Sequence, residues 1–315
     1  MNRNMTRRSL LSLPLLATPL LAKDGDWIKR VGARAQADSS GHITSLNLRG
    51  SWVDDSDMFE VADFPDLRYL NLAHTRITDE GLLRIKILKL VEELDLGYTE
   101  LITDSGMMCV RDWRNLTRLN LRGTRVGDGA LEILGKLVQL RALDVSDTDV
   151  ADTGFDYLIT LTSLENLSLS GHTVGAIGIS SLRLLTTLKR LDLSGARTSR
   201  RGSRLEPLEG ELVEVIAGLT GLETLELGHL GVTVESLRSL SHLEAVAKLG
   251  LAGCGLVDDG AIAVLSGWRS LQRLDLQDTM VTAVGVARLR EARPDLRVLA
   301  NPGAKASEPD IATEH

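Results

Sequence analysis

The sequence predicts an α/β repeat protein, in which short units of one strand and one helix stack along a common axis. Three observations predict this class. A motif of the form LxxLxL recurs every 24 or 25 residues along most of the 315-residue chain. Each motif is followed by small polar residues and then by an Asp or Thr that precedes a second apolar stretch. Hydrophobic residues make up 43 % of the chain and aromatic residues only 3 %, so the core must be aliphatic.

The first residue of each LxxLxL motif defines position one of a unit. Position one is occupied by Ile43, Leu67, Val91, Leu116, Leu140, Leu164, Leu188, Leu222, Val246 and Leu271. The successive spacings are 24, 24, 25, 24, 24, 24, 34, 24 and 25 residues, and a terminal fragment begins at Leu296. A single strand and short helix cannot bury their apolar faces alone, whereas stacked units share one continuous core. Ten units predict a parallel sheet of ten or eleven strands.

Alternation within the motif assigns a direction to each side chain. Positions four and six, such as Leu119 and Leu121, are expected to point inward, and positions three, five and seven outward. An apolar residue at position eleven, such as Val126, should close the turn. The Asp or Thr-Asp that follows, as in Thr78 and Asp79, should cap the helix.

The units resemble those of leucine-rich repeat proteins over roughly residues 43 to 300. The stretches LRYLNLAHTRITDEGLLRI and LTRLNLRGTRVGDGALEIL carry the resemblance. Position nine is mostly Thr where many subfamilies have Asn, and the T-x-V-T-D-x-G-L pattern is similar to the cysteine-containing subclass and to repeats of exported bacterial proteins. The resemblance implies a right-handed, horseshoe-shaped solenoid with the parallel sheet on its concave face and the helices on its convex face.

The N-terminal 22 residues have the pattern of a signal peptide. A basic region with Arg3, Arg7 and Arg8 precedes a mainly apolar stretch of twelve residues from Leu10 to Leu21, which is too short to cross a bilayer. Ala22 provides the small residue before cleavage. The stretch TRRSLL resembles a twin-arginine export motif, and general secretion remains an alternative. We therefore expect an exported bacterial protein, periplasmic or secreted, without stable membrane insertion.

The two ends of the repeat array need covers. Residues 23–42 are predicted to cap the N-terminal end, with an amphipathic segment from Asp26 to Ala37 that places Trp27, Ile28, Val31 and Ala35 on one face. Residues 301–315 are polar, contain two prolines and show no periodicity, so a disordered tail is expected.

The sequence lacks the motifs of the common enzyme and cofactor classes. It contains no nucleophile elbow, Walker loop, HExxH or dinucleotide-binding fingerprint, so we expect no catalysis and no cofactor. The net charge of −7 and pI near 5.5 disfavour nucleic acid as a partner. Asp95 and Asp144 lie two strands apart, about 10 Å, which is too far for one calcium ion.

Several single residues have structural interpretations. Cys254 replaces a position-nine Thr and should be a small inward residue, while Trp113 and Trp268 should pack in the turn between helix and strand. We expect ordinary solvated side chains at the three histidines in turns, which are His74, His172 and His229.

The outward positions of the strands form a polar lattice that could recognise a partner. Position three includes Glu93 and the basic residues Arg118, Arg190, Lys248 and Arg273, and position five carries mostly Asp and Asn. Arg118 and Arg122 beside Asp144 are the expected anchors. The alternative is that these charges only keep a broad sheet soluble. The candidate partner-binding residues are Arg118, Asn120, Arg122, Asp144, Arg190, Asp192, Arg197, Arg200, Arg201 and Arg204.

About ten extra residues, roughly Arg200 to Glu209, interrupt the period in a strand-to-helix turn. Added loop length costs little, so the segment could be merely tolerated. Loops on a rigid scaffold also carry function, and we favour a partner-contacting loop over residues 197–209.

These features together predict a monomeric module that binds or scaffolds another protein. An inhibitor that covers the active site of a secreted hydrolase is the main alternative. A ubiquitin-ligase substrate adaptor has similar repeats but needs a helical docking domain before them. Only about 20 residues separate Ala22 from Ile43, and an export signal precedes them, so the sequence disfavours this role.

Overall fold

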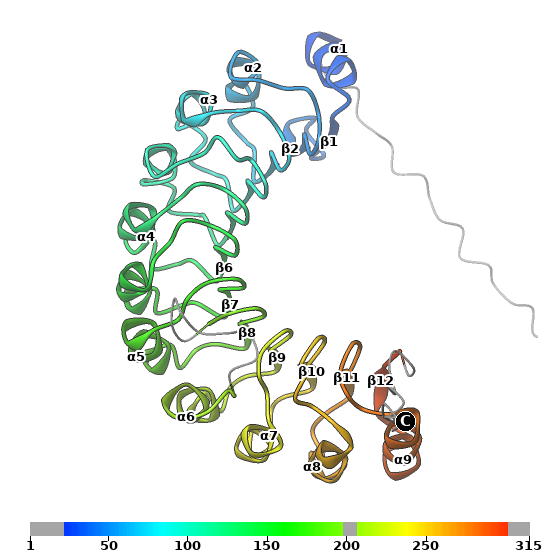
Figure 1. The fold of residues 1–315 in the computed structure, drawn as a ribbon. Helices are drawn as coiled ribbons and strands as arrows, with labels where there is room; N and C mark the ends of the chain where they lie inside the picture. Colours follow the sequence, from blue (N-terminus) through cyan, green and yellow to red (C-terminus); the bar gives the residue numbers. More distant parts are fainter. Residues whose placement is uncertain (1–21, 198–206, 302–315) are drawn as a thin grey trace, which may run out of the picture.

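The chain forms a horseshoe in which a curved sheet lines the inner face and helices line the outer face (Figure 1). The computed structural model describes residues 22–197 and 207–301. Neighbouring strands in the sheet are also neighbours in the chain. This arrangement is the α/β solenoid that the repeat period predicts, because each unit packs mainly against the units before and after it.

Within the described residues the sheet has twelve strands, in the order β1 to β12. They are β1 Arg34–Ala37, β2 Ile43–Asn47, β3 Tyr69–Asn71, β4 Glu93–Asp95, β5 Arg118–Asn120, β6 Ala142–Asp144, β7 Asn166–Ser168, β8 Arg190–Asp192, β9 Thr224–Glu226, β10 Lys248–Gly250, β11 Arg273–Asp275 and β12 Arg297–Leu299. The strands from β2 to β12 are parallel, which confirms the predicted sheet. The remaining strand, β1, pairs antiparallel with β2 and was not expected.

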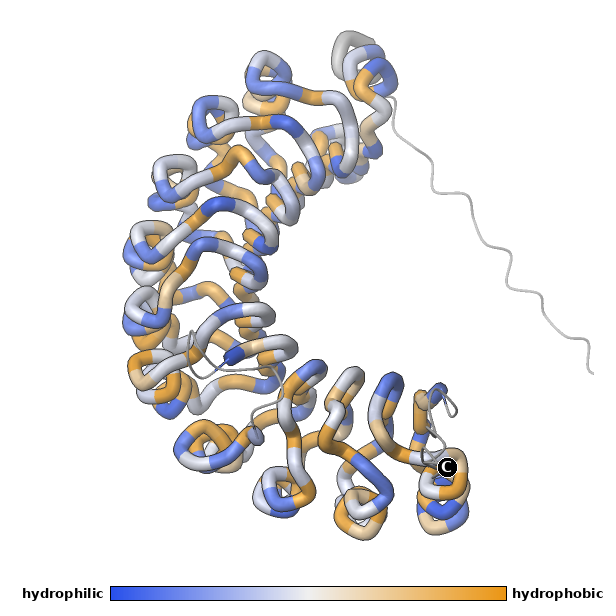
Figure 2. The backbone as a smooth tube through the Cα atoms, in the orientation of Figure 1, coloured by the Kyte–Doolittle hydropathy of each residue, from blue (hydrophilic) through white to orange (hydrophobic). Residues whose placement is uncertain are grey.

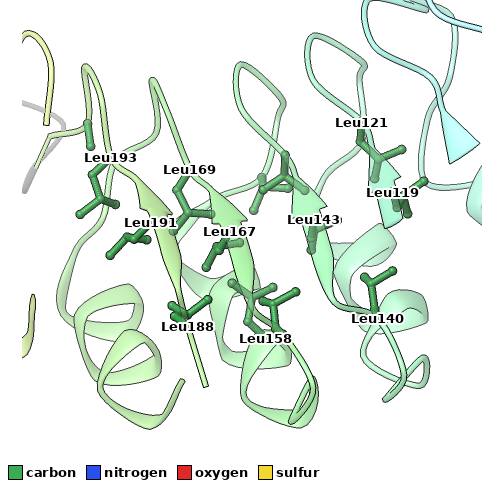
Figure 3. Close-up of a cluster of buried hydrophobic side chains, with 14 of the residues drawn as sticks. Leu119, Leu121, Leu140, Leu143, Leu158, Leu167, Leu169, Leu188, Leu191 and Leu193 are labelled. Carbon is green, nitrogen blue, oxygen red and sulfur yellow. The ribbon is translucent and has the colours of Figure 1, made fainter. Parts of the chain in front are cut away.

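The inward leucines form the core between the sheet and the helices. Position-four leucines occupy the same register on adjacent strands, as in the row Leu94, Leu119 and Leu143. At position six, Leu121 is fully buried, and equivalent leucines such as Leu169 lie beside the same layer (Figure 3). Apolar positions recur in both the strands and the helical segments along the solenoid (Figure 2), and their buried side chains form one core.

Short helical segments cover the outer face. The α-helices are α1 Ala22–Arg30, α2 Met58–Ala62, α3 Asp79–Arg84, α4 Asp128–Leu134, α5 Ala176–Leu184, α6 Glu211–Gly218, α7 Val234–Leu240, α8 Ile262–Gly267 and α9 Ala283–Ala292, and 3-10 helices span Gly106–Cys109, Asp152–Thr160 and Asp259–Ala261. Thr78 caps α3 as expected, because its side chain accepts a hydrogen bond from the Glu80 N–H.

The N-terminal cap differs in part from the predicted amphipathic segment. The helix α1 ends at Arg30, and residues 34–37 form the strand β1 rather than a continuation of the helix. Trp27 and Ile28 are buried as expected, while Val31 and Ala35 are partly buried against the core. The alternating exposure of β1 explains the error, since its small and polar residues have a period of two.

Aspartates at the starts of the helical segments connect each unit to the next. In six units an aspartate accepts a hydrogen bond of 2.6–2.8 Å from a backbone N–H at the start of the following helical segment. These aspartates are Asp55, Asp79, Asp104, Asp128, Asp152 and Asp259. The contact explains the recurring glycine of the D-x-G pattern: at Gly106 or Gly154, an added Cβ would lie within 3.0 Å of the preceding unit's aspartate. Gly129, directly after Asp128, lies equally close to Asp104 of the preceding unit.

Position nine forms a second ladder inside the solenoid. The hydroxyls of Thr75, Thr124 and Thr148 donate to the position-six carbonyl oxygens of their own units. Cys254 is buried at this position, as expected, and its thiol donates to the Leu227 carbonyl.

The expectation that His172 is solvated is wrong. Its side chain is 5 % exposed, its Nε2 lies 2.6 Å from the Val145 carbonyl oxygen, and its ring packs edge-on against Phe155. The reason is that residue 172 occupies position nine, so the imidazole takes the inward place that Thr has elsewhere.

The two late-unit tryptophans pack as expected between helix and strand. Trp113 and Trp268 are buried, and their indole N–H groups donate to the carbonyl oxygens of Lys86 and Leu243 at 3.2 Å. Each indole therefore bonds to a carbonyl of the preceding unit, at position 20 for Lys86 and at position 22 for Leu243.

The extra residues lie between β8 and α6, in the strand-to-helix connection where they were expected. Arg197 and Pro207 border the connection, and each forms a bridge to a neighbouring loop, Arg197 with Thr173 and Pro207 with Gly231. Residues 198–206 lie outside the described residues, as do the predicted signal peptide up to residue 21 and the tail from residue 302. In the described part of the chain, no helix is long and apolar enough to cross a membrane.

Candidate concave binding surface

The inner face of the sheet encloses a polar hollow of about 680 Å³. Outward-pointing residues of nine consecutive strands, β3 to β11, line it together with the edges of the position-four leucines. Among its polar and aromatic lining residues are Tyr69, Glu93, Asp95, Arg118, Asn120, Asp144, Asn166, Ser168, Arg190, Asp192, Thr224, Glu226, Lys248 and Arg273. Five of the predicted partner-binding residues therefore share one surface: Arg118, Asn120, Asp144, Arg190 and Asp192.

The Asp and Asn side chains at position five of successive strands form a column across the sheet, which we call the acidic column. This column has a structural role that was not predicted. In seven units the Asp or Asn side-chain oxygen accepts a hydrogen bond of 2.8–3.0 Å from the N–H two residues later. This contact is an Asx turn, which ends the strand and starts the loop. Asp144 and Asp192 each commit one oxygen to this turn, and Asp192 also accepts from the Ser168 hydroxyl at 3.1 Å.

Asparagines join this column laterally. The side-chain amides of Asn71 and Asn120 donate to the two oxygens of Asp95 at 2.9 and 2.8 Å. Much of the hydrogen-bonding capacity of the acidic column is therefore already used inside the protein in its N-terminal half.

The side chains at position three of successive strands form a second column, which contains the basic residues that line the hollow. Near its N-terminal end, Arg118 is 3.3 Å from the Glu93 carboxylate, so these two charges compensate each other. Arg190 lies between the neutral residues Asn166 and Thr224 in the strand register. Within residues 22–197 and 207–301 it has no ion-pair partner, and it is exposed.

Farther along, the same column is basic. Lys248 and Arg273 are neighbours in the parallel register, and Arg297 follows on the next strand. Lys248 forms an ion pair of 2.6 Å with Glu226, whereas the part of the chain that the structure describes offers no carboxylate partner to Arg273 or Arg297. The C-terminal half of the concave face therefore presents cations on a surface whose acidic neighbours are mostly engaged.

Two predicted anchors lie apart from this hollow. The Arg122 guanidinium turns toward the next loop, where it forms an ion pair of 3.1 Å with Asp147, and it does not line the hollow. Arg197 is exposed at the edge of the loops. Arg200, Arg201 and Arg204 lie outside the described residues, so their relation to the concave face remains a prediction.

The described residues contain no group of three or more His, Cys, Asp or Glu side chains placed to hold a metal ion. Burial raises the pKa of the Cys109 thiol to about 12 and that of Cys254 to about 11. Both thiols therefore stay protonated near neutral pH and are poor nucleophiles.

The repeats match a family model described as Leucine Rich repeat over residues 65–86 and 89–110. A comparison with curated proteins finds no match. The matched repeats, the stacked units and the curved parallel sheet together show the α/β solenoid fold of leucine-rich repeat proteins.

Solved structures with the same fold come from different sources. An internalin of Listeria monocytogenes shares 18 % identity and a TM-score of 0.53 over 94 % of this chain and 100 % of its own. A Leptospira interrogans leucine-rich repeat protein shares 18 % identity and a TM-score of 0.50, over 76 % of this chain and 62 % of its own.

A plant receptor ectodomain also matches. The leucine-rich repeat ectodomain of the Arabidopsis receptor kinase HAESA, solved with an N-terminally extended IDA peptide hormone, shares 18 % identity and a TM-score of 0.53 over 79 % of this chain and 40 % of its own. At such low identities the likeness shows the fold alone.

Proposed function

We propose that this protein is a non-catalytic module that binds another protein through the concave hollow. The observation that carries the proposal is the unneutralised basic row formed by Arg190, Arg273 and Arg297 on the inner face. Exposed arginines on a rigid surface are effective interface anchors, because the planar guanidinium binds carboxylates with two parallel hydrogen bonds. The expected partner presents carboxylates on a convex surface that enters the hollow.

Two further features complete the proposal. We place Asp144 and Asp192 in the same contact, each through the carboxylate oxygen that the Asx turn does not use, which in Asp192 also accepts from the Ser168 hydroxyl. The loop over residues 197–209, with Arg197, Arg200, Arg201 and Arg204, adds cations next to Arg190 along the chain.

The N-terminal signal pattern supports a periplasmic or secreted location, with the protein acting there as a monomer. An inhibitor of a secreted hydrolase would use the same concave face. A tight one-to-one complex that abolishes a hydrolase activity would favour that role over a scaffold.

Chemical cross-linking and capture from extracytoplasmic extract tests the proposal. Four baits of residues 23–315 are compared: the native sequence, Arg190→Glu with Arg273→Glu, the loop variant Arg200→Glu with Arg201→Glu and Arg204→Glu, and a control. The control changes Arg111 and Arg269, exposed arginines that do not line the hollow, to Glu.

We expect the native and control baits to capture the same partner and the concave variant to lose it. Loss with the loop variant alone would move recognition to residues 197–209. Equal capture by all four baits would refute both surfaces.

A further inference from the structure

The loops that follow the first four parallel strands carry an exposed cluster of arginine and aromatic side chains, which we call the N-terminal rim. The rim lies on the edge of the solenoid, where positions seven to ten of each unit connect strand to helix, and its described members do not line the concave hollow. It consists of Arg49, Trp52, His74, Arg76, Tyr98, Leu101 and Arg125.

Trp52 is the strongest feature of the rim. Its side chain is 82 % exposed, whereas the other three tryptophans of the chain, Trp27, Trp113 and Trp268, are buried. The Arg76 guanidinium lies over the indole, 5.0 Å from the ring centroid. An exposed indole does not contribute to the core, and a guanidinium stacked on it holds both groups in place for contact with a partner.

A second pair of rings extends the cluster. The rings of His74 and Tyr98 stack at a centroid distance of 4.9 Å, and Arg49 lies 3.0 Å from the His74 Nε2. The Tyr98 ring covers the next loop so closely that a Cβ on Gly123 would be 2.5 Å from its Cδ1. Rings and guanidinium groups from successive units therefore pack in two groups, Arg76 on Trp52 and Arg49 with His74 and Tyr98.

The backbone under these rings is unusual for such residues. His74 and Tyr98 occupy position eight with φ of 57° and 59°, in the left-handed region, where five other units have glycine and Asp147, His229 and Asp278 adopt the same conformation. Bulky residues are uncommon there because the left-handed conformation brings Cβ close to the backbone. The conformation belongs to the turn of every unit, and in the rim two successive turns carry aromatic rings at this position.

The charge of the rim is opposite to that of the whole protein. Positions seven to ten of the first four units contain four arginines, at residues 49, 76, 122 and 125, against one carboxylate, Glu100, while the chain has a net charge of −7. Arg122 is paired with Asp147, but among the described residues no carboxylate forms an ion pair with Arg49, Arg76 or Arg125. The uncompensated charges favour an anionic partner.

We propose that the N-terminal rim is a second contact surface, which binds an acidic segment of a partner protein. Carboxylates of that segment pair with Arg49, Arg76 and Arg125, and one aromatic or aliphatic side chain packs between Trp52 and Tyr98. This contact is independent of the concave hollow and does not require it.

A display library of random twelve-residue peptides, selected on the full chain, tests this surface. Binding of enriched peptides is then measured to the native chain, to the rim variant Trp52→Ser with Arg76→Gln, and to a control, Ile87→Ser with Lys89→Gln. The control removes one exposed apolar residue and one positive charge, as the rim variant does, but away from the rim. The concave variant Arg190→Glu is measured beside them, and unchanged melting temperatures verify that all the variants are folded.

We expect acidic peptides with an apolar residue, whose affinity falls about tenfold or more in the rim variant and less than about twofold in the control and in Arg190→Glu. Bound peptide should also protect Trp52, the exposed indole, from acrylamide quenching. Failure to enrich peptides that prefer the native chain over the rim variant, or enrichment of uncharged or basic peptides, overturns the proposal. Loss of binding in Arg190→Glu alone would place the contact in the concave hollow.

Discussion

The substitution Gly129→Ala should destabilise the native chain, but it should stabilise a chain in which Asp104 is replaced by Ala. Gly129 lies in the first turn of α4, and an added Cβ would meet only Asp104 of the preceding unit, 2.6 Å from its Oδ2. The other oxygen of that carboxylate accepts a hydrogen bond of 2.6 Å from the Gly127 N–H. The methyl group and the hydrogen-bonded carboxylate cannot both keep these positions.

The magnitudes follow from two opposing terms. Displacing Asp104 loses a hydrogen bond to a charged group, which costs about 1.5–3 kcal/mol. Replacing Gly by Ala inside a helix gains about 1 kcal/mol. Gly129→Ala should therefore destabilise the native chain by about 0.5–2 kcal/mol, and should stabilise the Asp104→Ala variant by about 0.5–1 kcal/mol.

The assay is a double-mutant cycle with urea unfolding followed by far-UV circular dichroism. The four proteins are the native chain, the two single variants and the double variant. An equal change in unfolding free energy from Gly129→Ala in both backgrounds would refute this explanation of Gly129, because it would mean that the glycine does not accommodate Asp104 of the preceding unit.

Three further predictions concern the core, the charge contacts and the thiols. Leu121→Ala should lower the free energy of unfolding by about 2–5 kcal/mol, because the side chain is fully buried; a neutral result in urea unfolding would contradict its inward position. Hydrogen bonds from the side chain and then the backbone of Thr282 lower the pKa of Asp259, so its contribution to stability is present above the unfolded pKa, about 3.9, and is lost as the pH falls through the folded value. The stability difference between the native chain and Asp259→Asn should therefore shrink in thermal melts on acidification, and a constant difference would argue against this contact. Cys109 and Cys254, with pKa values of about 12 and 11, should resist iodoacetamide in the folded chain at neutral pH and react after unfolding, as mass spectrometry can show; rapid labelling of either thiol before unfolding would contradict its burial.

The repeat period was sufficient to predict the fold because every unit repeats the same physical requirement. Each LxxLxL motif must bury its side chains at positions four and six. Ten such units bury them by stacking around one continuous core. The strand β1 was missed although RAQA alternates, because Asp26 to Ala37 was interpreted as one amphipathic segment. His172 was missed because it was considered as a turn residue, whereas its place at position nine makes it equivalent to the inward threonines.

The candidate site was less predictable. The sequence identifies which strand positions face the hollow. It does not indicate that one oxygen each of Asp144 and Asp192 accepts the hydrogen bond of an Asx turn, or that Arg122 forms an ion pair with Asp147. The N-terminal rim lies mainly at positions seven, eight and ten, which vary from unit to unit. The glycines at position eight of five other units indicate a left-handed backbone there, but nothing in the one-letter sequence indicates that His74 and Tyr98 stack.

The aspartate contacts between units are unequally distributed along the horseshoe. They link the units up to Asp152 and return at Asp259, but the equivalent positions of the intervening units include Ala176 and Val234. There α5 and α6 are linked by the exposed ion pair of Arg183 and Glu211, and α7 is capped within its own helix by Thr233 and Ser236. Because the aspartate contacts are missing there, bending of the solenoid should concentrate around α5 to α7. The two arms of the horseshoe can then change their separation while each keeps its own curvature.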